Sequence, residues 1–315
     1  MVLRSRRFLH ILHAIFVSFV VVLFSCGAGA QTKVVLLGTG TPRPFPDRSG
    51  PATAIVTGDC VYLVDFGPGV IRRSAAAAEE KGVAALNPAN IKVAFVTHLH
   101  SDHTAGLPDL ILTPWVMGRS QLDIYGPGGT EDMTSHVLAA WRQDIDIRMK
   151  GLEHREAPPG VRAHDVKAGV VYKDDRVTVA AFKVHHGDWP EAFGYRFNTT
   201  DRSIVISGDT SPGPELEAAC KPCDVMIHEV YSPSSTVPSM PDWKSYRAKY
   251  HTSTEQMGQI ADRTKPGLLI IYHVSGRGSG PGGRTPDEQL LSEVRKNYQG
   301  RVVIGHDLEI YYIHE

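Results

Sequence analysis

Short apolar runs, separated by longer mixed segments, recur along the chain from Val34 onward. Runs of this kind are typical of strands that are buried on both faces. Between them, Gly69–Lys81 is rich in alanine, and Glu131–Arg142 carries apolar residues at helical spacing. The pattern predicts further helices near Glu215, Glu255 and Glu288, and strands at Val34–Leu37, Val61–Asp65, Val93–Thr97, Leu122–Tyr125, Val177–Val184, Phe193–Phe197, Ser203–Ser207, Val225–His228, Leu268–Tyr272 and Val302–His306.

Strands and helices alternate over residues 31–315 without low-complexity segments or internal repeats. A length of about 285 residues lies near the upper limit for a single hydrophobic core. We therefore predict one α/β domain with two mixed sheets flanked by helices. In such an αββα sandwich, the polar site residues would follow the ends of strands along one edge.

Residues 1–30 have a different pattern, in which three arginines precede an apolar stretch at Ile11–Phe24 and small residues follow it. This order is typical of a cleaved secretory signal, and the stretch is shorter than a transmembrane helix requires. We expect cleavage after Ala30, no stable membrane span in the mature chain, and a periplasmic or secreted location. A twin-arginine route and lipoprotein anchoring at Cys26 are alternatives.

The charge balance argues against a general nucleic-acid-binding protein. Loss of residues 1–30 would remove three arginines and no acidic residue, which changes the formal net charge from −1 to −4. Proteins that bind polyanions usually carry a positive face, and the sequence has no long run of lysine or arginine. No general nucleic-acid-binding patch is therefore expected.

The segment Thr97–His103 contains four side chains that can bind metal. Residues two apart on an extended segment face the same way, so His98 and His100 can share one ion. Asp102 and His103 lie where the chain turns towards a helix, and they would bind a second ion. Packing gives no reason for such a dense group of polar side chains. Because two neighbouring divalent cations are a recurrent means of activating water, the segment predicts a hydrolase.

The order His-x-His-x-Asp-His in this segment resembles the metallo-β-lactamase-fold hydrolases, and two further motifs narrow the resemblance. Leu37–Pro42 and Leu63–Gly67 look like the opening strands of the branch that contains ribonuclease Z. In that branch, a histidine upstream of a Gly-Tyr-Arg sequence supplies the next metal ligand. His186 fits because the family ligand directly precedes a small residue, although His185 can also rotate into the site.

Two later polar residues directly follow buried strands. Open sheets usually carry their binding and catalytic residues at these strand ends. Asp209 follows the run at residues 204–206, and its carboxylate can bridge two cations and offset their repulsion. His273 follows the run at residues 268–271 and completes the second site. The expected ligands are His98, His100, His186 and Asp209 for one ion, and Asp102, His103, Asp209 and His273 for the other.

Nitrogen and oxygen donors without thiolate favour two zinc ions, while manganese and iron also accept such a mixture. A water held between the two ions would have its pKa lowered towards neutrality and would attack the substrate as a bridging hydroxide. Cys220 and Cys223 lack the second pair that a zinc ribbon needs, and a disulfide between them is an option.

The resemblance also implies a general acid and the residues that support it. His251, in a His-Thr-Ser-Thr segment, resembles the ribonuclease Z histidine that protonates the leaving group, and the ordinary pKa of histidine suits this role. Glu229 matches a glutamate that orients this acid, and Asp65 would hold a metal-bound imidazole by its second nitrogen. The expected catalytic residues are Asp102, His251 and Glu229.

These residues predict an exported zinc-dependent hydrolase, similar to ribonuclease Z, that cleaves a phosphodiester or another ester in a small or medium anionic substrate. A secreted β-lactamase is the alternative, as are the arylsulfatase and lactonase activities of the same superfamily. Many ribonuclease Z enzymes grip tRNA with a long Gly- and Lys-rich arm, which is missing between Tyr125 and His186. Trp189 can line the substrate site or pack on the sheet edge, and Arg277 can bind an anionic oxygen. A homodimer is one option for the assembly.

Overall fold

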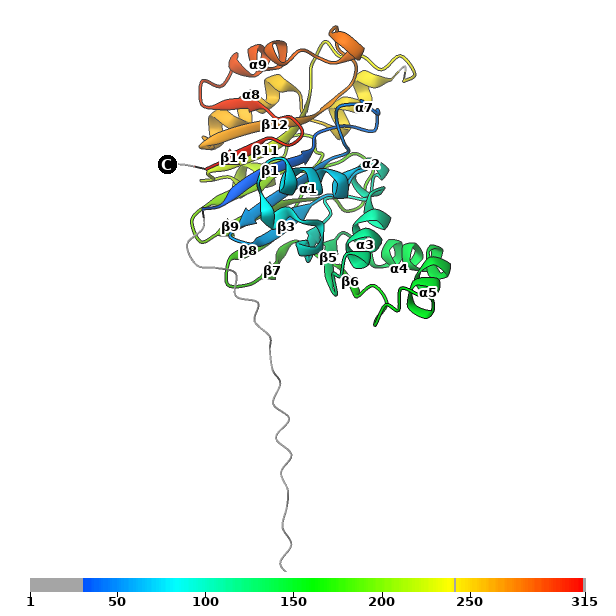
Figure 1. Ribbon diagram of the computed structural model, residues 1–315. Coiled ribbons are helices and arrows are strands. Elements are labelled where there is room, and N and C mark those ends of the chain that lie inside the picture. Colours follow the sequence, from blue (N-terminus) through cyan, green and yellow to red (C-terminus); the bar gives the residue numbers. More distant parts are fainter. Residues whose placement is uncertain (1–30, 241, 314–315) are drawn as a thin grey trace, which may run out of the picture.

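Two seven-stranded mixed sheets lie face to face in the computed structural model, which describes residues 31–240 and 242–313 (Figure 1). In spatial order, the first sheet contains β14 (Ile310–Tyr312), β1 (Lys33–Gly38), β2 (Ala52–Thr57), β3 (Cys60–Val64), β4 (Val93–Phe95), β5 (Leu122–Gly126) and β6 (Val161–Asp165). The second contains β13 (Val302–Ile304), β12 (Leu268–Ser275), β11 (Val225–Tyr231), β10 (Ser203–Ile206), β9 (Phe193–Thr199), β8 (Val177–Lys183) and β7 (Gly169–Lys173). Strands β3 to β6 are parallel to one another, and so are β10 to β13.

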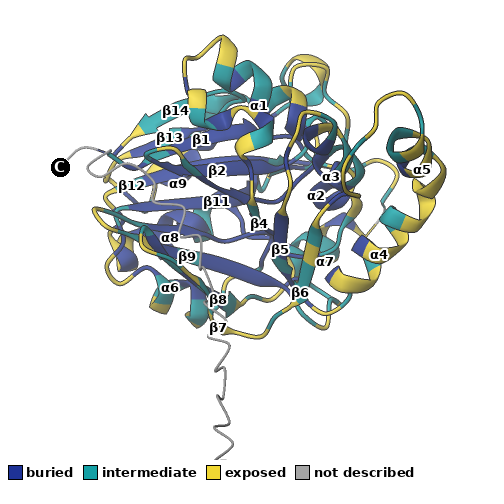
Figure 2. Cartoon of the chain, turned by 60° about the horizontal axis from the view of Figure 1, so that its bottom comes forward, coloured by how far each residue is buried: buried dark blue, intermediate teal, exposed yellow. Residues whose placement is uncertain are grey.

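Helices cover the outer face of each sheet and complete the αββα sandwich. The first sheet is covered by α1 (Val70–Glu79) and α3 (Leu107–Val116), and the second by α6 (Pro214–Ala219), α8 (Thr254–Thr264) and α9 (Asp287–Arg295). The other helical segments are α2 (Ser101–Thr104), α4 (Thr130–Ala140), α5 (Arg142–Lys150), α7 (Trp243–Tyr250) and 3-10 turns at Ala84–Leu86, Pro88–Asn90 and Pro281–Gly283. Of these, α4 and α5 project from one end and are largely exposed (Figure 2).

Alternation of side chains along the strands divides the apolar core into three layers. In β1, Val34 and Leu36 join the layer between the two sheets, whereas Val35 and Leu37 join the layer beneath α1. In β12, Leu269 belongs to the third layer, which lies beneath α8 and α9. The continuous apolar runs in the sequence are thus strands that bury both faces.

Phe95 of β4 lies in the layer between the sheets and is fully buried. Its ring lies 5.3 to 6.0 Å, between centroids, from the rings of Tyr125, Tyr172, Tyr195 and Phe197. We expect Phe95→Ala to lower the free energy of unfolding by about 3–5 kcal/mol, because it leaves a cavity that both sheets line. Urea denaturation measures the change.

Leu152→Ala is the matched control, because this side chain is 97% exposed. It should change the free energy of unfolding by less than about 0.5 kcal/mol. An equally small change for Phe95→Ala would show that the two sheets do not depend on this shared layer.

The predicted α/β fold with two mixed sheets and flanking helices is confirmed, and the predicted strands and helices are present with ends shifted by a few residues. The pattern missed β2, β6, β7 and β14. Strands β6 and β7 are partly exposed and lie at sheet edges, so polar residues such as Arg162 and His164 interrupt their apolar pattern.

The expected signal at residues 1–30, with its alternative anchor at Cys26, lies outside the described residues. Within the part of the chain that the structure covers, no helix combines the length and apolar character needed to cross a bilayer.

Candidate metal and catalytic site

The expected site residues gather at one edge of the sandwich, at the C-terminal ends of parallel strands from both sheets. In the first sheet, β3 leads into Asp65 and β4 leads into the segment from His98 to His103. In the second sheet, Asp209 follows β10, while Glu229 and His273 lie near the ends of β11 and β12. Parallel strands place these ends at the same edge, so residues that are far apart in sequence become neighbours.

Three imidazoles converge in the first cluster. Nε2 of His98 lies 3.0 Å from Nδ1 of His100, and Nε2 of His186 lies 3.1 Å from the same atom. Together with Asp209, these residues offer donor atoms that all lie within 4.8 Å of one another. The structure therefore brings together the four ligands expected for the first ion.

Asp102, His103 and His273 form a second cluster, again with donor atoms within 4.8 Å of one another. Nε2 of His103 and Nε2 of His273 lie 3.6 and 3.7 Å from Oδ2 of Asp102. Asp209 reaches this cluster as well, with Oδ1 3.5 Å from Nε2 of His103 and Oδ2 3.1 Å from Nε2 of His273. Its carboxylate lies between the two clusters, as a bridging ligand would.

Asp65 fixes the orientation of His103 from behind, as the sequence predicts. It accepts hydrogen bonds from the Thr97 amide at 2.8 Å, the Thr97 hydroxyl at 3.0 Å and Nδ1 of His103 at 2.8 Å. These bonds hold Asp65 in a left-handed conformation with φ of 59°, which is uncommon for a residue other than glycine. Nε2 of His103 is thereby directed at the cluster.

Backbone carbonyl groups orient two other histidines. Nδ1 of His273 donates to the Gly40 carbonyl, and Nδ1 of His186 donates to the Tyr250 carbonyl at 2.8 Å. The register between β11 and β12 shifts at His273, and such a bulge re-aims a side chain. His185 is exposed and belongs to neither cluster, so of the two adjacent histidines the structure places His186 in the site.

Burial keeps the imidazoles of the first cluster neutral. It lowers the pKa of His98 well below the ordinary value, lowers that of His100, and lowers that of His186 to about 4. A neutral imidazole presents a lone pair, which is the form that binds a metal ion.

In the second cluster, carboxylates outweigh the effect of burial. Burial alone would lower the pKa of both histidines, but Asp65 and Asp209 raise that of His103 well above its ordinary value, and Asp209 raises that of His273 to about 9. The two imidazoles in turn overcome burial at Asp209 and hold its pKa well below the usual range. A cation bound here would displace these protons, so metal affinity should fall as the pH falls.

The donor atoms fit divalent cations. Oδ2 of Asp102, Nε2 of His103 and Oδ1 of Asp209 are buried and have no hydrogen-bond partner among the described residues. Buried polar atoms without partners are costly, and here they belong to groups that face one another. Cations held by the two clusters would satisfy them.

His251 lies next to the clusters, just after α7. Its Nδ1 is 3.2 Å from Oε1 of Glu229 and 4.0 Å from Oδ2 of Asp209. Oε1 of the buried Glu229 also accepts hydrogen bonds from the amides of Thr210 and Thr252 at 3.3 and 3.1 Å. Burial would lower the pKa of His251, but Glu229 and Asp209 raise it above the ordinary value. Both carboxylates therefore favour the protonated form of His251.

The clusters open into a cavity of about 560 Å³. Alongside His251 and the metal-site residues, its lining includes an apolar and aromatic group and two arginines: Val237, Pro238, Met240, Trp243, Tyr246, Arg43 and Arg277. Arg277, which the sequence offers as a residue that can bind an anionic oxygen, lines this cavity. Trp189 packs against His100 instead of lining the cavity, with 2.9 Å between its Nε1 and Nε2 of His100.

Sequence reasoning missed Trp243, Tyr246 and Arg43. Trp243, Tyr246 and Tyr250 lie three and four positions apart on α7, and their rings stack at centroid distances of 5.7 and 4.2 Å. This spacing, directly before His251, is a signal for an aromatic helix face at the site.

The sequence matches the family model described as a Beta-lactamase superfamily domain over residues 61–274. It is 32% identical over 287 residues to Ribonuclease Z of Mycobacterium bovis, which covers 90% of this chain and 98% of the relative. The chain belongs to the metallo-beta-lactamase superfamily. Within the superfamily it is ribonuclease Z-like, and it is a metal-dependent hydrolase with two His/Asp clusters.

Solved structures of the superfamily share the fold. Human tRNase Z, short form, matches with a TM-score of 0.64 and 22% identity, covering 90% of this chain and 100% of that one. Zn(2+)-bound PqqB from Methylobacterium extorquens matches with a TM-score of 0.59 and 13% identity, covering 89% and 99%.

In this ribonuclease Z-like hydrolase, Asp65→Asn should weaken metal binding about 10–100-fold, because the amide cannot hold His103 as the carboxylate does. Competition with a zinc-chelating dye measures the affinity. Asp146→Asn, on the exposed face of α5, is the control and should leave the affinity unchanged. Unchanged affinity in Asp65→Asn would show that His103 needs no support from Asp65.

Proposed function

We propose that this hydrolase cleaves a phosphodiester, or a closely related anionic ester, in a small or medium substrate. The observation that supports the proposal most directly is the pair of His251 and Glu229 beside the shared carboxylate of Asp209. A proton donor next to a site that can activate water suits a reaction whose leaving alkoxide needs a proton.

The two clusters would each hold one divalent cation, with Asp209 shared between them. Their imidazole and carboxylate donors favour zinc, and manganese or iron would also be accepted. The zinc-bound state of the fold relative PqqB agrees with this preference. When bound, such ions lower the pKa of water and neutralise charge on the attacked phosphoryl group.

The residues of the chain supply the remaining steps. Asp102 lines the cavity, so its carboxylate can accept a hydrogen bond from the attacking water and orient it, besides binding the second ion. His251 donates its proton to the leaving oxygen. Glu229 favours the protonated form of His251 and orients its ring, and two backbone amides in turn hold the Glu229 carboxylate.

A small or medium substrate suits the cavity better than a folded RNA. Its volume of about 560 Å³ lies within the range of small-molecule sites. The sequence lacks the long Gly- and Lys-rich arm, and the chain without residues 1–30 has a formal net charge of −4. A substrate that carries its own negative charge would be bound locally, by arginines in the cavity.

The test is the rate at which the zinc-loaded protein hydrolyses bis(p-nitrophenyl) phosphate, with the Asp209→Ala variant as the control. A rate far above that of the variant supports the phosphodiesterase function. No rate on this ester, together with hydrolysis of a chromogenic cephalosporin, p-nitrophenyl sulfate or a lactone, would move the assignment to a β-lactamase, arylsulfatase or lactonase.

Export to the periplasm or medium is part of the same proposal. The arginines and apolar stretch of residues 1–30 support it, and so does the disulfide between Cys220 and Cys223, because disulfides persist in oxidising compartments. N-terminal sequencing of the protein from cell fractions should find Gln31 first in an exported fraction. A cytoplasmic protein with residues 1–30 intact would contradict export, and an acylated Cys26 would replace free release by anchoring.

A further inference from the structure

Two arginines meet at the rim of the cavity without an acidic partner. A Cβ atom added to Gly283 would lie 2.8 Å from Nη1 of Arg43 and 3.0 Å from Nε of Arg277, so the two guanidinium groups are neighbours. Within residues 31–240 and 242–313, neither arginine forms an ion pair with a carboxylate. Adjacent like charges repel, and a bound anion would relieve that repulsion.

Contacts with the protein hold both arginines in place. Nη2 of Arg43 donates to the Gly282 carbonyl at 2.7 Å, and its guanidinium lies 4.9 Å from the centre of the Phe45 ring. Nη1 of Arg43 is buried and has no hydrogen-bond partner in the described chain. The backbone of Arg277 pairs with Thr236, while its side chain is exposed. The pair thus offers a buried, unpartnered donor of Arg43 beside the exposed guanidinium group of Arg277.

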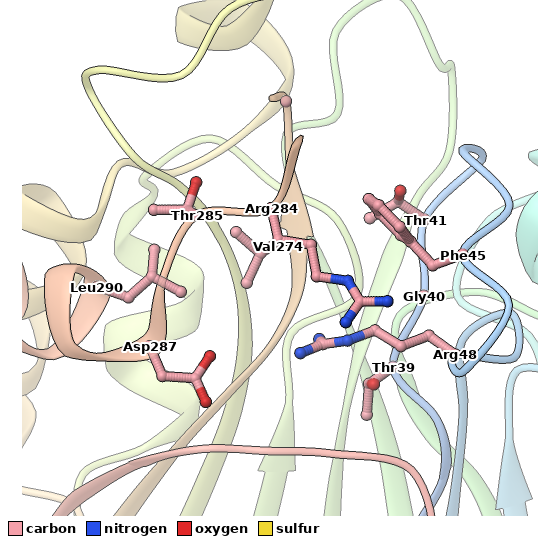
Figure 3. A pocket seen from close by; sticks show the side chains of 11 residues that line it. Thr39, Gly40, Thr41, Phe45, Arg48, Val274, Arg284, Thr285, Asp287 and Leu290 are labelled. Carbon is pink, nitrogen blue, oxygen red and sulfur yellow. The ribbon is translucent and has the colours of Figure 1, made fainter. Parts of the chain in front are cut away.

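Two other arginines nearby are already engaged. Figure 3 shows Arg48 and Arg284 pointing into a smaller neighbouring cavity of about 20 Å³. Arg284 pairs with Asp47, and Arg48 lies 3.1 Å from Nδ1 of His306. In the main cavity, Arg43 and Arg277 are therefore the cations left to bind a ligand.

The proton donor lies at the aromatic part of the cavity lining. The ring of His251 is 5.8 Å from the Tyr246 ring and 6.5 Å from the Trp243 ring, between centroids. A leaving oxygen must approach His251 to receive its proton, so the group attached to that oxygen contacts these two rings. Flat groups gain most from such a surface, because aromatic rings stack on one another.

We propose that the cavity selects a phosphodiester with two different arms. The leaving alcohol carries a flat aromatic group that packs on Trp243 and Tyr246, and the retained arm carries a second anionic group that binds between Arg43 and Arg277. This substrate class rests on the proposed phosphodiesterase function. A short nucleotide ester with an additional phosphate has this form, with a base on the leaving arm.

The placement of the two arms determines which P–O bond breaks. Water forms the new P–O bond and loses one proton to solvent, while the P–O bond to the aromatic arm breaks and its oxygen takes the proton of His251. The products are an alcohol and a phosphate monoester that keeps the second anionic group. The arginines remain bound to the retained arm throughout.

A matched pair of chromogenic esters tests the anion subsite: thymidine 5′-(p-nitrophenyl phosphate) with and without a 3′-phosphate. We expect the 3′-phosphate to raise kcat/KM about tenfold or more, as charge-assisted hydrogen bonds of this kind do. Arg277→Ala and Arg43→Gln should each remove most of that advantage, so that the kcat/KM values of the two esters converge in each variant. Arg295→Ala, on the exposed face of α9, is the control and should keep the advantage.

Product analysis tests the proposed placement of the two arms of the substrate. From the dinucleotide pTpT, with its 5′-terminal phosphate, we expect thymidine and thymidine 3′,5′-bisphosphate. Two molecules of thymidine 5′-phosphate would overturn the proposed placement of the arms.

The outcomes separate this inference from the function on which it rests. Equal kcat/KM for the two esters, or an advantage that survives both arginine substitutions, would overturn the anion subsite and leave the phosphodiesterase function standing. No hydrolysis of these esters or of bis(p-nitrophenyl) phosphate would overturn the proposed function itself. Thermal unfolding of Arg43→Gln separates lost binding from lost folding.

Discussion

Replacing Asp209 by alanine is expected to abolish hydrolysis and to lower bound zinc from about two ions per chain to about one. Asp209 is shared by both clusters, with contacts of 3.5 Å to His103 and 3.1 Å to His273 and a donor atom in the His98 cluster. Without it, two neighbouring cations would repel each other with no anion between them. Elemental analysis of the zinc-loaded variant, alongside its rate, measures both effects.

Asp146→Ala, on exposed α5, is the control for Asp209→Ala and should keep both ions and full activity. Circular dichroism of the two variants would separate metal loss from misfolding. An Asp209→Ala protein that keeps two ions and its activity would show that this carboxylate does not bridge the clusters.

Replacing His251 by glutamine is expected to lower kcat about 10²–10⁴-fold for an ester with a nucleoside leaving group. The same change should have a much smaller effect on a p-nitrophenyl ester, because p-nitrophenolate leaves readily without a proton. Comparison of the two leaving groups in the variant and the unaltered protein measures the proton transfer directly. Equal losses for both would show that His251 shapes the site and does not donate a proton.

We expect Glu229→Gln to change how the rate of hydrolysis of the nucleoside ester depends on pH. A general acid works in its protonated form, so activity is present below its pKa and is lost as the pH rises through it. Burial lowers the pKa of His251 while Glu229 and Asp209 raise it, so loss of the Glu229 charge should move the alkaline limb of the rate profile to lower pH. An alkaline limb at the same pH in the variant would show that Glu229 does not raise the pKa of His251.

Most of the site could be predicted because each of its parts has a local signal. His98, His100, Asp102 and His103 form one short motif, and Asp209 and His273 each follow an apolar strand. The choice between the adjacent His185 and His186 had a weaker signal, the glycine that follows His186. Neighbouring residues of an extended segment point in opposite directions, and the structure places His186 in the first cluster while His185 is exposed.

The substrate end of the cavity could be predicted only in part from local patterns. Arg43 and Arg277 belong to loops from opposite ends of the chain, and they meet only because the β1 and β12 strands deliver both loops to one edge of the sandwich. Loop arginines carry no periodicity. Arg277 could still be singled out because it follows the ligand His273 closely, whereas Arg43 has no such neighbour in the sequence.

The pairing of β1 with β14 has a consequence for how the protein is made. Lys33 of β1 pairs with Tyr312 of β14, so the ribosome releases one partner long before it synthesises the other. The nascent chain therefore carries an uncovered strand edge, which is prone to aggregation, through nearly all of translation. A polypeptide that terminates before residue 273 lacks both this closing strand and His273. It can neither cover its edge nor assemble the second cluster, and quality-control proteases can recognise it as unfinished.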